Sequence, residues 1–188
     1  MDKIIHAICI AINNCAYVNE KNNYFKCEVG AMDERKQKYL DNIRETAEEY
    51  FRKGEFFCSE SVVQTINDAL GKPYPEEVVK LASGFPIGIG KAQCLCGAVS
   101  GGEMALGMVY GRVHGEAMNP KMFEKAKGLH DYIKEEYKSL CCRIITREWA
   151  GDNFQSPERK QHCITITGKV AEWVARELIE DGVIKIEE

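Results

Sequence analysis

Cysteine is the residue whose number and spacing could do chemistry in this chain. Nine cysteines occur among 188 residues, which is too sparse for a secreted disulfide scaffold, and an odd number cannot all pair within one chain. In a reducing cytoplasm, clustered cysteines are more often metal ligands or redox thiols than structural bridges. Four of them fall at or just before the expected start of a helix, namely Cys58, Cys96, Cys142 and Cys163.

The start of a helix favours the chemically active form of a cysteine. The unpaired N–H groups of the first turn and the positive end of the helix dipole stabilise a thiolate and lower the pKa of the thiol. Thiolates are both the nucleophiles and the soft metal ligands of proteins. We therefore expect the four helix starts to converge on one centre.

The elements that must position these cysteines are helices. Apolar residues recur at spacings of three and four, and no alternating strand pattern exceeds a few residues. The expected helices are 32–53, 58–70, 76–81, 97–112, 120–137, 141–150 and a last one that follows 157–162 and is closed by Gly182. The fold class is therefore all-α, as a single helical bundle-like domain of about six to seven helices.

Residues 1–31 differ from the rest of the chain. They contain Cys9, Cys15 and Cys27 and two asparagine pairs, and they show no sustained period after Ile12. We expect 1–31 to be an N-terminal extension that is poorly ordered or lies upstream of a natural start at Met32. The helical domain is then 32–188, and the three cysteines of the extension are expected to have no role.

Charge and hydropathy exclude two classes of partner. The formal net charge is −4 and the pI about 5.7, so no basic excess attracts nucleic acid. The longest apolar run, 4–12, is far shorter than the roughly 20 residues that span a bilayer, and no signal-peptide cleavage site follows it. We expect a cytoplasmic protein that does not cross a membrane.

Glycine is concentrated around the second of the four cysteines. The segment 83–93 contains four glycines or prolines and predicts a loop, but it matches neither a phosphate-binding nor a dinucleotide-binding motif. The helix after Cys96 contains Gly97, Gly101 and Gly102, which leave room for a cofactor or for close contact with another backbone. The same glycines are compatible with a homodimer seam.

Taken in order, these motifs resemble the redox-active C-GCAxxG-C-C family, which is named for its cysteine pattern. The matching segments, which span 106 residues from the first cysteine to the last, are 57–62, 88–90, 96–102, 139–143 and 162–163. The family pattern reads Gly-Cys-Ala, whereas here Leu95 precedes Cys96 and Gly97 stands before Ala98. The second cysteine of the motif is therefore Cys96 or, two residues earlier, Cys94.

The resemblance implies an all-helical cytoplasmic protein with a redox role. A similar domain in a multihaem cytochrome holds an iron–sulfur cluster, which implies such a cluster here, although no Cys-x-x-Cys-His haem site occurs. The expected function is electron transfer to an unidentified redox partner protein, through a cluster or other metal centre on the four cysteines. The alternatives are a metal-free thiol–disulfide oxidoreductase and a non-catalytic helical module with structural zinc or packed cysteines.

Other polar residues near the motifs have ordinary interpretations. Cys94 and Cys141 are as readily packing residues as ligands, because adjacent cysteines rarely both bind one centre. His162 adjoins Cys163, and a surface histidine is the more common case. Glu103 is expected to be a solvated acid of its helix rather than a general acid.

Overall fold

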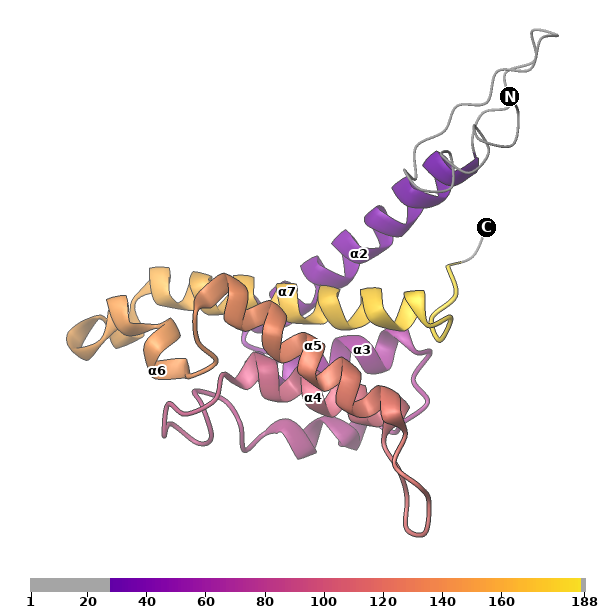
Figure 1. Ribbon diagram of the computed structural model, residues 1–188. Coiled ribbons are helices and arrows are strands. Elements are labelled where there is room, and N and C mark those ends of the chain that lie inside the picture. The colour runs from indigo at the N-terminus through magenta and orange to yellow at the C-terminus, as the bar shows by residue number, and fades with distance from the viewer. Residues whose placement is uncertain (1–27, 187–188) are drawn as a thin grey trace, which may run out of the picture. The chain divides into compact units, whose positions relative to one another are not determined.

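The computed structural model describes residues 28–186, and every regular element in that range is a helix. This confirms the all-α prediction (Figure 1). The six α-helices are α2 (Glu28–Lys53), α3 (Cys58–Ala69), α4 (Gly97–Tyr110), α5 (Pro120–Tyr137), α6 (Cys142–Ile145) and α7 (Pro157–Glu180). Three short 3-10 helices accompany them: η1 (Glu76–Ala82), η2 (Arg147–Trp149) and η3 (Gly151–Gln155).

The chain divides into two compact units between Lys38 and Tyr39. The second unit holds most of the helical structure and the whole of the candidate site. Helix α2 begins at Glu28 rather than at Met32, so the helical period extends further toward the N-terminus than the apolar pattern alone indicates. The expected extension and its three cysteines lie outside the described residues, apart from this first helical turn.

Helix α4 is the element on which the second unit is built. It contacts α3, α5 and α7, and α3 also packs on α7 (Figure 1). Each of the four helices contributes fully buried aliphatic side chains, such as Ile66, Leu106, Leu129 and Val170. Burial of such side chains contributes about 1.5–3 kcal/mol each, so this shared core fixes the relative positions of the helices.

The glycines of α4 allow its neighbours to approach closely. A Cβ placed on Gly101 would lie 2.5 Å from the carbonyl oxygen of Ser59, and one on Gly102 would lie 2.6 Å from Cδ2 of Leu129 and 2.7 Å from Cγ1 of Val170. The backbone that the glycines of α4 allow to approach closely is therefore the backbone of α3. These contacts set the separation of α3, α5 and α7 from α4.

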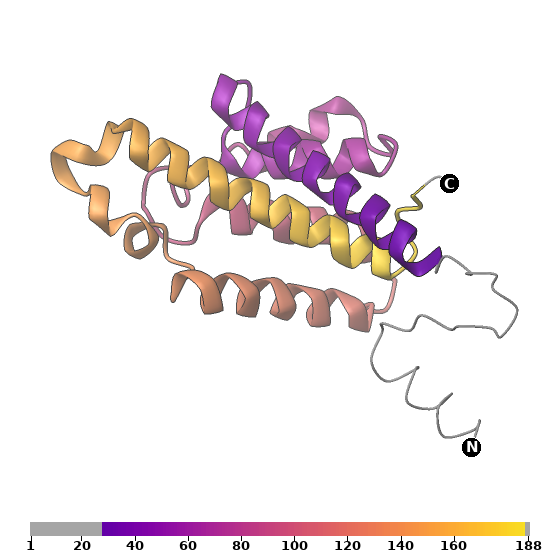
Figure 2. The same cartoon turned by 90° about the horizontal axis from the view of Figure 1, so that it is seen from above.

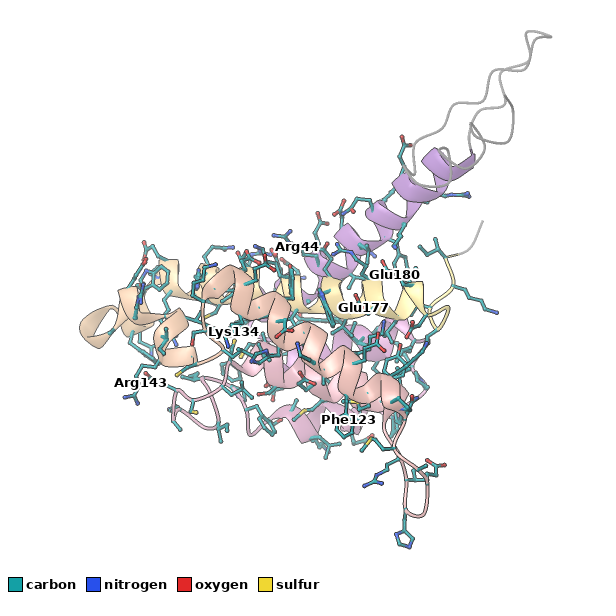
Figure 3. The ribbon with its side chains drawn as sticks, in the orientation of Figure 1. Arg44, Phe123, Lys134, Arg143, Glu177 and Glu180 are labelled. Atoms are coloured by element: carbon teal, nitrogen blue, oxygen red, sulfur yellow. The ribbon has the colours of Figure 1, made fainter. Side chains whose placement is uncertain are left out.

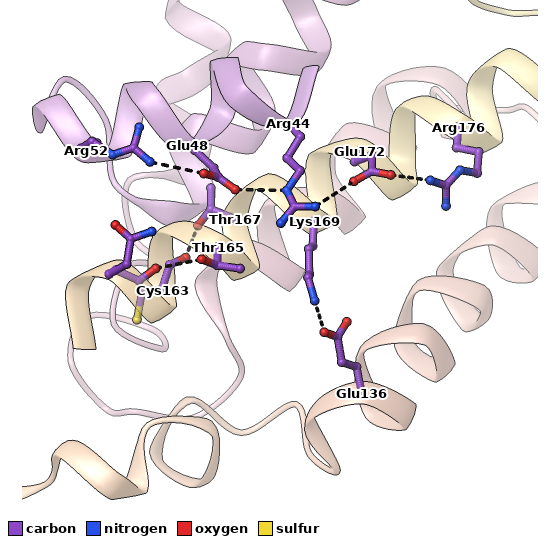
Figure 4. A network of polar contacts seen from close by, with 11 residues as sticks. Arg44, Glu48, Arg52, Glu136, Cys163, Thr165, Thr167, Lys169, Glu172 and Arg176 are labelled. Carbon is purple, nitrogen blue, oxygen red and sulfur yellow. Dashed lines mark hydrogen bonds and ion pairs between the residues drawn. The ribbon is translucent and has the colours of Figure 1, made fainter. Parts of the chain in front are cut away.

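Within the second unit, the segment 39–53 of α2 lies along α7 (Figure 2). A chain of alternating charges follows the contact (Figure 4), through Arg52, Glu48, Arg44, Glu172 and Arg176. Arg44 Nη1 lies 3.7 Å from Glu172 Oε2 across the two helices. A Cβ on Gly168 would lie 2.6 Å from Cγ of Glu48, so the absence of a side chain there sets how closely α2 approaches α7.

Besides α2, two helices differ markedly from the expected boundaries. The helix expected over 141–150 ends at Ile145, and two 3-10 helices, η2 and η3, follow it. The last helix begins at Pro157, capped by Ser156, rather than after His162. Cys163 therefore lies in the second turn of α7 and not at its start, which corrects the prediction.

The end of α7 away from Cys163 is fixed by a partly buried ion pair. Lys125 Nζ of α5 lies 2.7 Å from Oε2 of Glu177, which Figure 3 labels on α7, and 3.5 Å from Oδ1 of Asp181. Tyr110 donates its hydroxyl hydrogen to Asp181 Oδ2 at 2.7 Å. In the range 28–186, no helix is both long enough and apolar enough to cross a bilayer.

Candidate functional site

The structure brings the four predicted cysteines to one cavity. Cys58, Cys96, Cys142 and Cys163 all line an enclosed space of about 40 Å³ in the second unit. The remaining walls are largely apolar and are formed by Phe51, Phe57, Pro86, Ile87, Gly97, Ile145, Thr146, Arg159 and Ile166. No carboxylate and no imidazole lines the cavity, so thiols are its soft metal-binding groups.

Each thiol comes from a different helix. Cys58 is the first residue of α3, Cys96 is the N-cap of α4 and Cys142 is the first residue of α6, as the helix-start argument predicts. Cys163 comes from the second turn of α7 instead. The role of these cysteines as ligands or redox thiols stays a prediction, but their convergence does not depend on any shared sequence spacing.

The start of α3 is fastened to the segment that precedes the glycine-rich loop. Glu60 accepts a hydrogen bond from the Phe57 N–H at 2.8 Å and another from the Ser83 hydroxyl at 2.6 Å. Ser59, which is fully buried, donates its hydroxyl hydrogen to the carbonyl of Ala82 at 2.8 Å. Glu60 therefore anchors the helix start that presents Cys58, in addition to complementing the helix dipole.

The starts of α4 and α6 are joined directly. The Cys96 N–H donates to the carbonyl of Leu140 at 2.8 Å, and the Arg143 N–H donates to the carbonyl of Gln93 at 3.0 Å. These two bonds hold the segments 93–96 and 140–143 side by side. They fix Cys96 and Cys142 relative to each other, although 45 residues separate them in the sequence.

Gly97 is the glycine that shapes the cavity itself. A Cβ at this position would lie 2.5 Å from the sulfur of Cys58 and 3.0 Å from the carbonyl oxygen of Phe85. Gly97 lines the cavity, whereas Gly101 and Gly102 face Ser59 and the side chains of α5 and α7. Of the three glycines predicted to bind a cofactor, only Gly97 is therefore placed to do so.

The thiols are less acidic than the helix-start argument indicates. Burial raises the pKa of Cys58, Cys96 and Cys163 to about 12 each, and burial also raises the pKa of Cys142. The N–H of Ile87 opposes this effect at Cys58, and first-turn N–H groups oppose it at Cys96. The prediction of lowered pKa values is wrong for this conformation, because removal from water costs the thiolate more than these N–H groups restore.

The raised pKa values give the metal-free chain a definite pH dependence. The folded state keeps thiol protons, up to a pKa of about 12 for Cys96, that the unfolded state loses above the ordinary thiol value of 9.0. The contribution of these protonated thiols to the stability of the fold is complete below about pH 9 and is lost as the pH rises toward 12. Urea unfolding in a chelating buffer between about pH 7 and 11 should show falling stability. Cys94→Ser protein, in which only an exposed thiol is altered, should show the same dependence of stability on pH as the parent protein. If the stability of the parent protein does not change with pH, the cavity thiols do not have raised pKa values.

Arg159 is a cavity residue that sequence reasoning missed. It is 9% exposed, and its Nε atom is buried with no hydrogen-bond partner. The guanidinium stacks over the Phe154 ring at 3.9 Å, and its charge lowers the pKa of Cys142 and of Cys163 against the larger effect of burial. Among the side chains that the structure describes, no carboxylate is paired with it, and none lines the cavity. The cavity lining therefore contains one cation and no carboxylate.

The wall opposite α7 is a loop in an unusual backbone conformation. Residues 87–91 all have positive φ, including Ile87 at 56° and Ile89 at 48°, which are β-branched residues in the left-handed region. Gly88 also has positive φ, and a Cβ there would lie 2.7 Å from the nitrogen of Cys94. The loop is thus folded tightly on itself where its Pro86 and Ile87 close the cavity.

The remaining candidate residues lie outside the cavity. Cys94 is exposed, whereas Cys141 is partly buried and donates to the Gln93 carbonyl at 3.3 Å. His162 is not a surface histidine, because its ring packs against Trp149 with centroids 4.8 Å apart. Burial raises the pKa of Glu103 to about 7, so it is not simply solvated.

As they stand, no three histidine, cysteine, aspartate or glutamate side chains in the described part of the chain are grouped so that they could hold a metal ion. The four cavity thiols therefore surround a space rather than a single point.

These observations define a class of protein: an all-helical chain in which four helices each present one thiol to a shared buried cavity. The model of the family described as "Putative redox-active protein (C_GCAxxG_C_C)" matches residues 56–177, which is more than half of the chain and includes all four cysteines. The chain belongs to this family, as the resemblance indicated. No curated protein and no solved structure matches the chain.

Proposed function

We propose that this chain is an electron-transfer protein whose four cavity thiolates bind an iron–sulfur cluster. The observation that carries the proposal is the composition of one cavity, whose lining combines four thiols from distant helices with a buried arginine and contains no carboxylate. Thiolates are the ligands that iron–sulfur clusters require, and a centre held by four of them carries net negative charge. Arg159 supplies the matching positive charge.

The rest of the cavity suits this role. N–H groups of Ala98 and Val99 point to the sulfur of Cys96, and the Ile87 N–H points to that of Cys58. Hydrogen bonds of this kind tune the reduction potential of a cluster, which when bound supplies one-electron chemistry. The apolar walls, including Phe51 and Ile166, keep water from the thiolates. A redox partner protein would then exchange electrons with the site.

Metal analysis of native protein tests the proposal. Protein purified without oxygen should be brown and should contain iron and acid-labile sulfide, and protein reconstituted with iron and sulfide should regain both. Colourless, iron-free protein after reconstitution contradicts it. One equivalent of zinc in place of iron supports the structural-zinc alternative. Loss of two hydrogens at a defined pair among the four cysteines, without metal, supports the thiol–disulfide alternative.

Substitution of Arg159 should have opposite effects on the metal-free and the loaded protein. Arg159→Met removes a buried charge from a lining that contains no carboxylate, so urea unfolding of metal-free protein should show equal or greater stability, by about 1–3 kcal/mol. The same change removes the counter-charge of the bound centre, so the iron content should fall and the reduction potential should become more negative. Arg159→Lys, which keeps the charge, should restore part of the iron content and reverse part of the change in reduction potential. Reduced stability with unchanged iron would show that the arginine is only structural.

A further inference from the structure

Two cysteines that the proposed centre does not use lie close together at the edge of the cavity. Cys94 is exposed and Cys141 is partly buried, and neither lines the cavity. Both stand next to residues that do: Cys94 is two residues before Cys96, and Cys141 immediately precedes Cys142. Both segments are well fixed, so the separation of the two thiols can be argued from backbone contacts.

The backbone bonds described above bracket these two cysteines. The Cys96 N–H donates to the Leu140 carbonyl, and the Arg143 N–H donates to the Gln93 carbonyl, so Cys94 and Cys141 lie between the two bonds on facing segments. The bonds pair residue 96 with 140 and residue 93 with 143, so the segments run antiparallel, with Cys94 opposite Cys142 and Cys141 opposite Leu95. Cys94 and Cys141 are therefore diagonal neighbours, and the contact that bounds their separation is that of the Cys141 sulfur.

The sulfur of Cys141 already points to the other segment. It donates to the Gln93 carbonyl oxygen at 3.3 Å, and that carbonyl belongs to the peptide bond that joins Gln93 to Cys94. Across a trans peptide, the oxygen lies about 2.8 Å from the next Cα. The Cys141 sulfur is therefore within about 6 Å of the Cα of Cys94, and rotation about χ1 of Cys94 can close most of the remaining gap.

We propose that Cys94 and Cys141 form a reversible dithiol–disulfide pair that exchanges with a small external disulfide. The exposed Cys94 thiolate attacks one sulfur of that disulfide, a mixed disulfide forms and the first thiolate leaves. The Cys141 thiolate then attacks the Cys94 sulfur and releases the second. The pair is oxidised by two electrons, the external disulfide is reduced to two thiols, and the two protons pass from the cysteines to the departing thiolates.

The pair is chemically separate from the four cavity thiols, so this inference does not rest on the proposed cluster. Its position nevertheless links it to the site. A bond between Cys94 and Cys141 would join the segments 93–96 and 140–143 covalently, beside two hydrogen bonds that already connect them. Oxidation of the pair would therefore hold the segments that carry Cys96 and Cys142 together.

Exchange with glutathione disulfide tests the pair in the full-length protein. Reduced protein is incubated with glutathione disulfide, alkylated, digested with trypsin and analysed by mass spectrometry. The expected product joins peptides 92–112 and 139–143, with a loss of two hydrogens. Because each peptide contains two cysteines, fragment spectra must place the bond between Cys94 and Cys141. A bond through Cys96 or Cys142, or no linked peptide, overturns the proposal.

Two variants test the order of events. Cys141→Ser, whose hydroxyl can keep the bond to the Gln93 carbonyl, should accumulate glutathione on Cys94, because the second attack is lost. Cys94→Ser should yield neither the linked peptide nor a mixed disulfide on Cys141. If instead Cys141 is the residue that retains glutathione, the assigned roles are wrong. Iron content is measured in the same samples, so failure of the dithiol pair and failure of the proposed cluster are told apart.

Discussion

Cys96→Ser protein is expected to fold normally and to lose its metal centre. Serine is a preferred N-cap, and Cys96 is the N-cap of α4, so the substitution should not weaken the helix. A serine hydroxyl does not ionise near neutral pH and is a poor soft ligand. Metal affinity should fall by more than about 100-fold, since loss of even the outer hydrogen-bond partner of a ligand costs about 10–100-fold. Iron analysis and circular dichroism measure the two effects.

Cys94→Ser is the matched control, because it is two residues away and alters an exposed thiol outside the cavity. It should retain iron at the level of the parent protein. The two variants also decide which cysteine is the second one of the family motif, which the sequence leaves open. If Cys94→Ser loses the centre and Cys96→Ser keeps it, the register and the proposed ligand set are both wrong.

Gly101→Ala is expected to cause the largest loss of stability of any single methyl addition in α4. The new Cβ would lie 2.5 Å from the carbonyl oxygen of Ser59 and 2.9 Å from its Cα, and backbone atoms cannot rotate away. Helices α3 and α4 would have to separate, at a cost of about 3 kcal/mol or more. Urea unfolding of the metal-free protein measures this cost without any contribution from ligand binding.

Gly107→Ala provides the control in the same helix. No atom lies within 4 Å of a Cβ at this position, so the only effect is the higher helix propensity of alanine. The variant should be more stable by about 0.5–1 kcal/mol. If Gly101→Ala and Gly107→Ala lower the free energy of unfolding by the same amount, the close packing of α3 on α4 does not explain the loss of stability in Gly101→Ala protein.

The sequence predicted the helices well where their ends are marked by local chemistry. Pro120 and Gly71 mark the start of α5 and the end of the α3 segment, and the apolar spacing identified the buried faces. The same kind of signal was overlooked at α7, where Ser156 and Pro157 form a standard N-terminus. Recognising it would have placed Cys163 in the second turn.

Arg159 could have been found by the same correction. Once α7 begins at Pro157, Arg159 and Cys163 are four residues apart and share one face of the helix. The early end of α6 was harder to foresee, because no glycine or proline stands between Cys142 and Ala150 to mark it. The raised pKa values could not be foreseen, since burial is a property of the tertiary structure rather than of the position of a cysteine in its helix.

The arrangement of one thiol on each of four helices also determines when the cavity exists during folding. Cys58 and Cys163 lie 105 residues apart in the sequence, and they meet only when α3 and α7 have both docked on α4. Contacts of such long sequence separation form late, because the entropy of closing the intervening chain must be lost first. Any fragment that ends before α7 lacks the fourth thiol. A complete four-thiol site therefore reports that the whole helical assembly has formed.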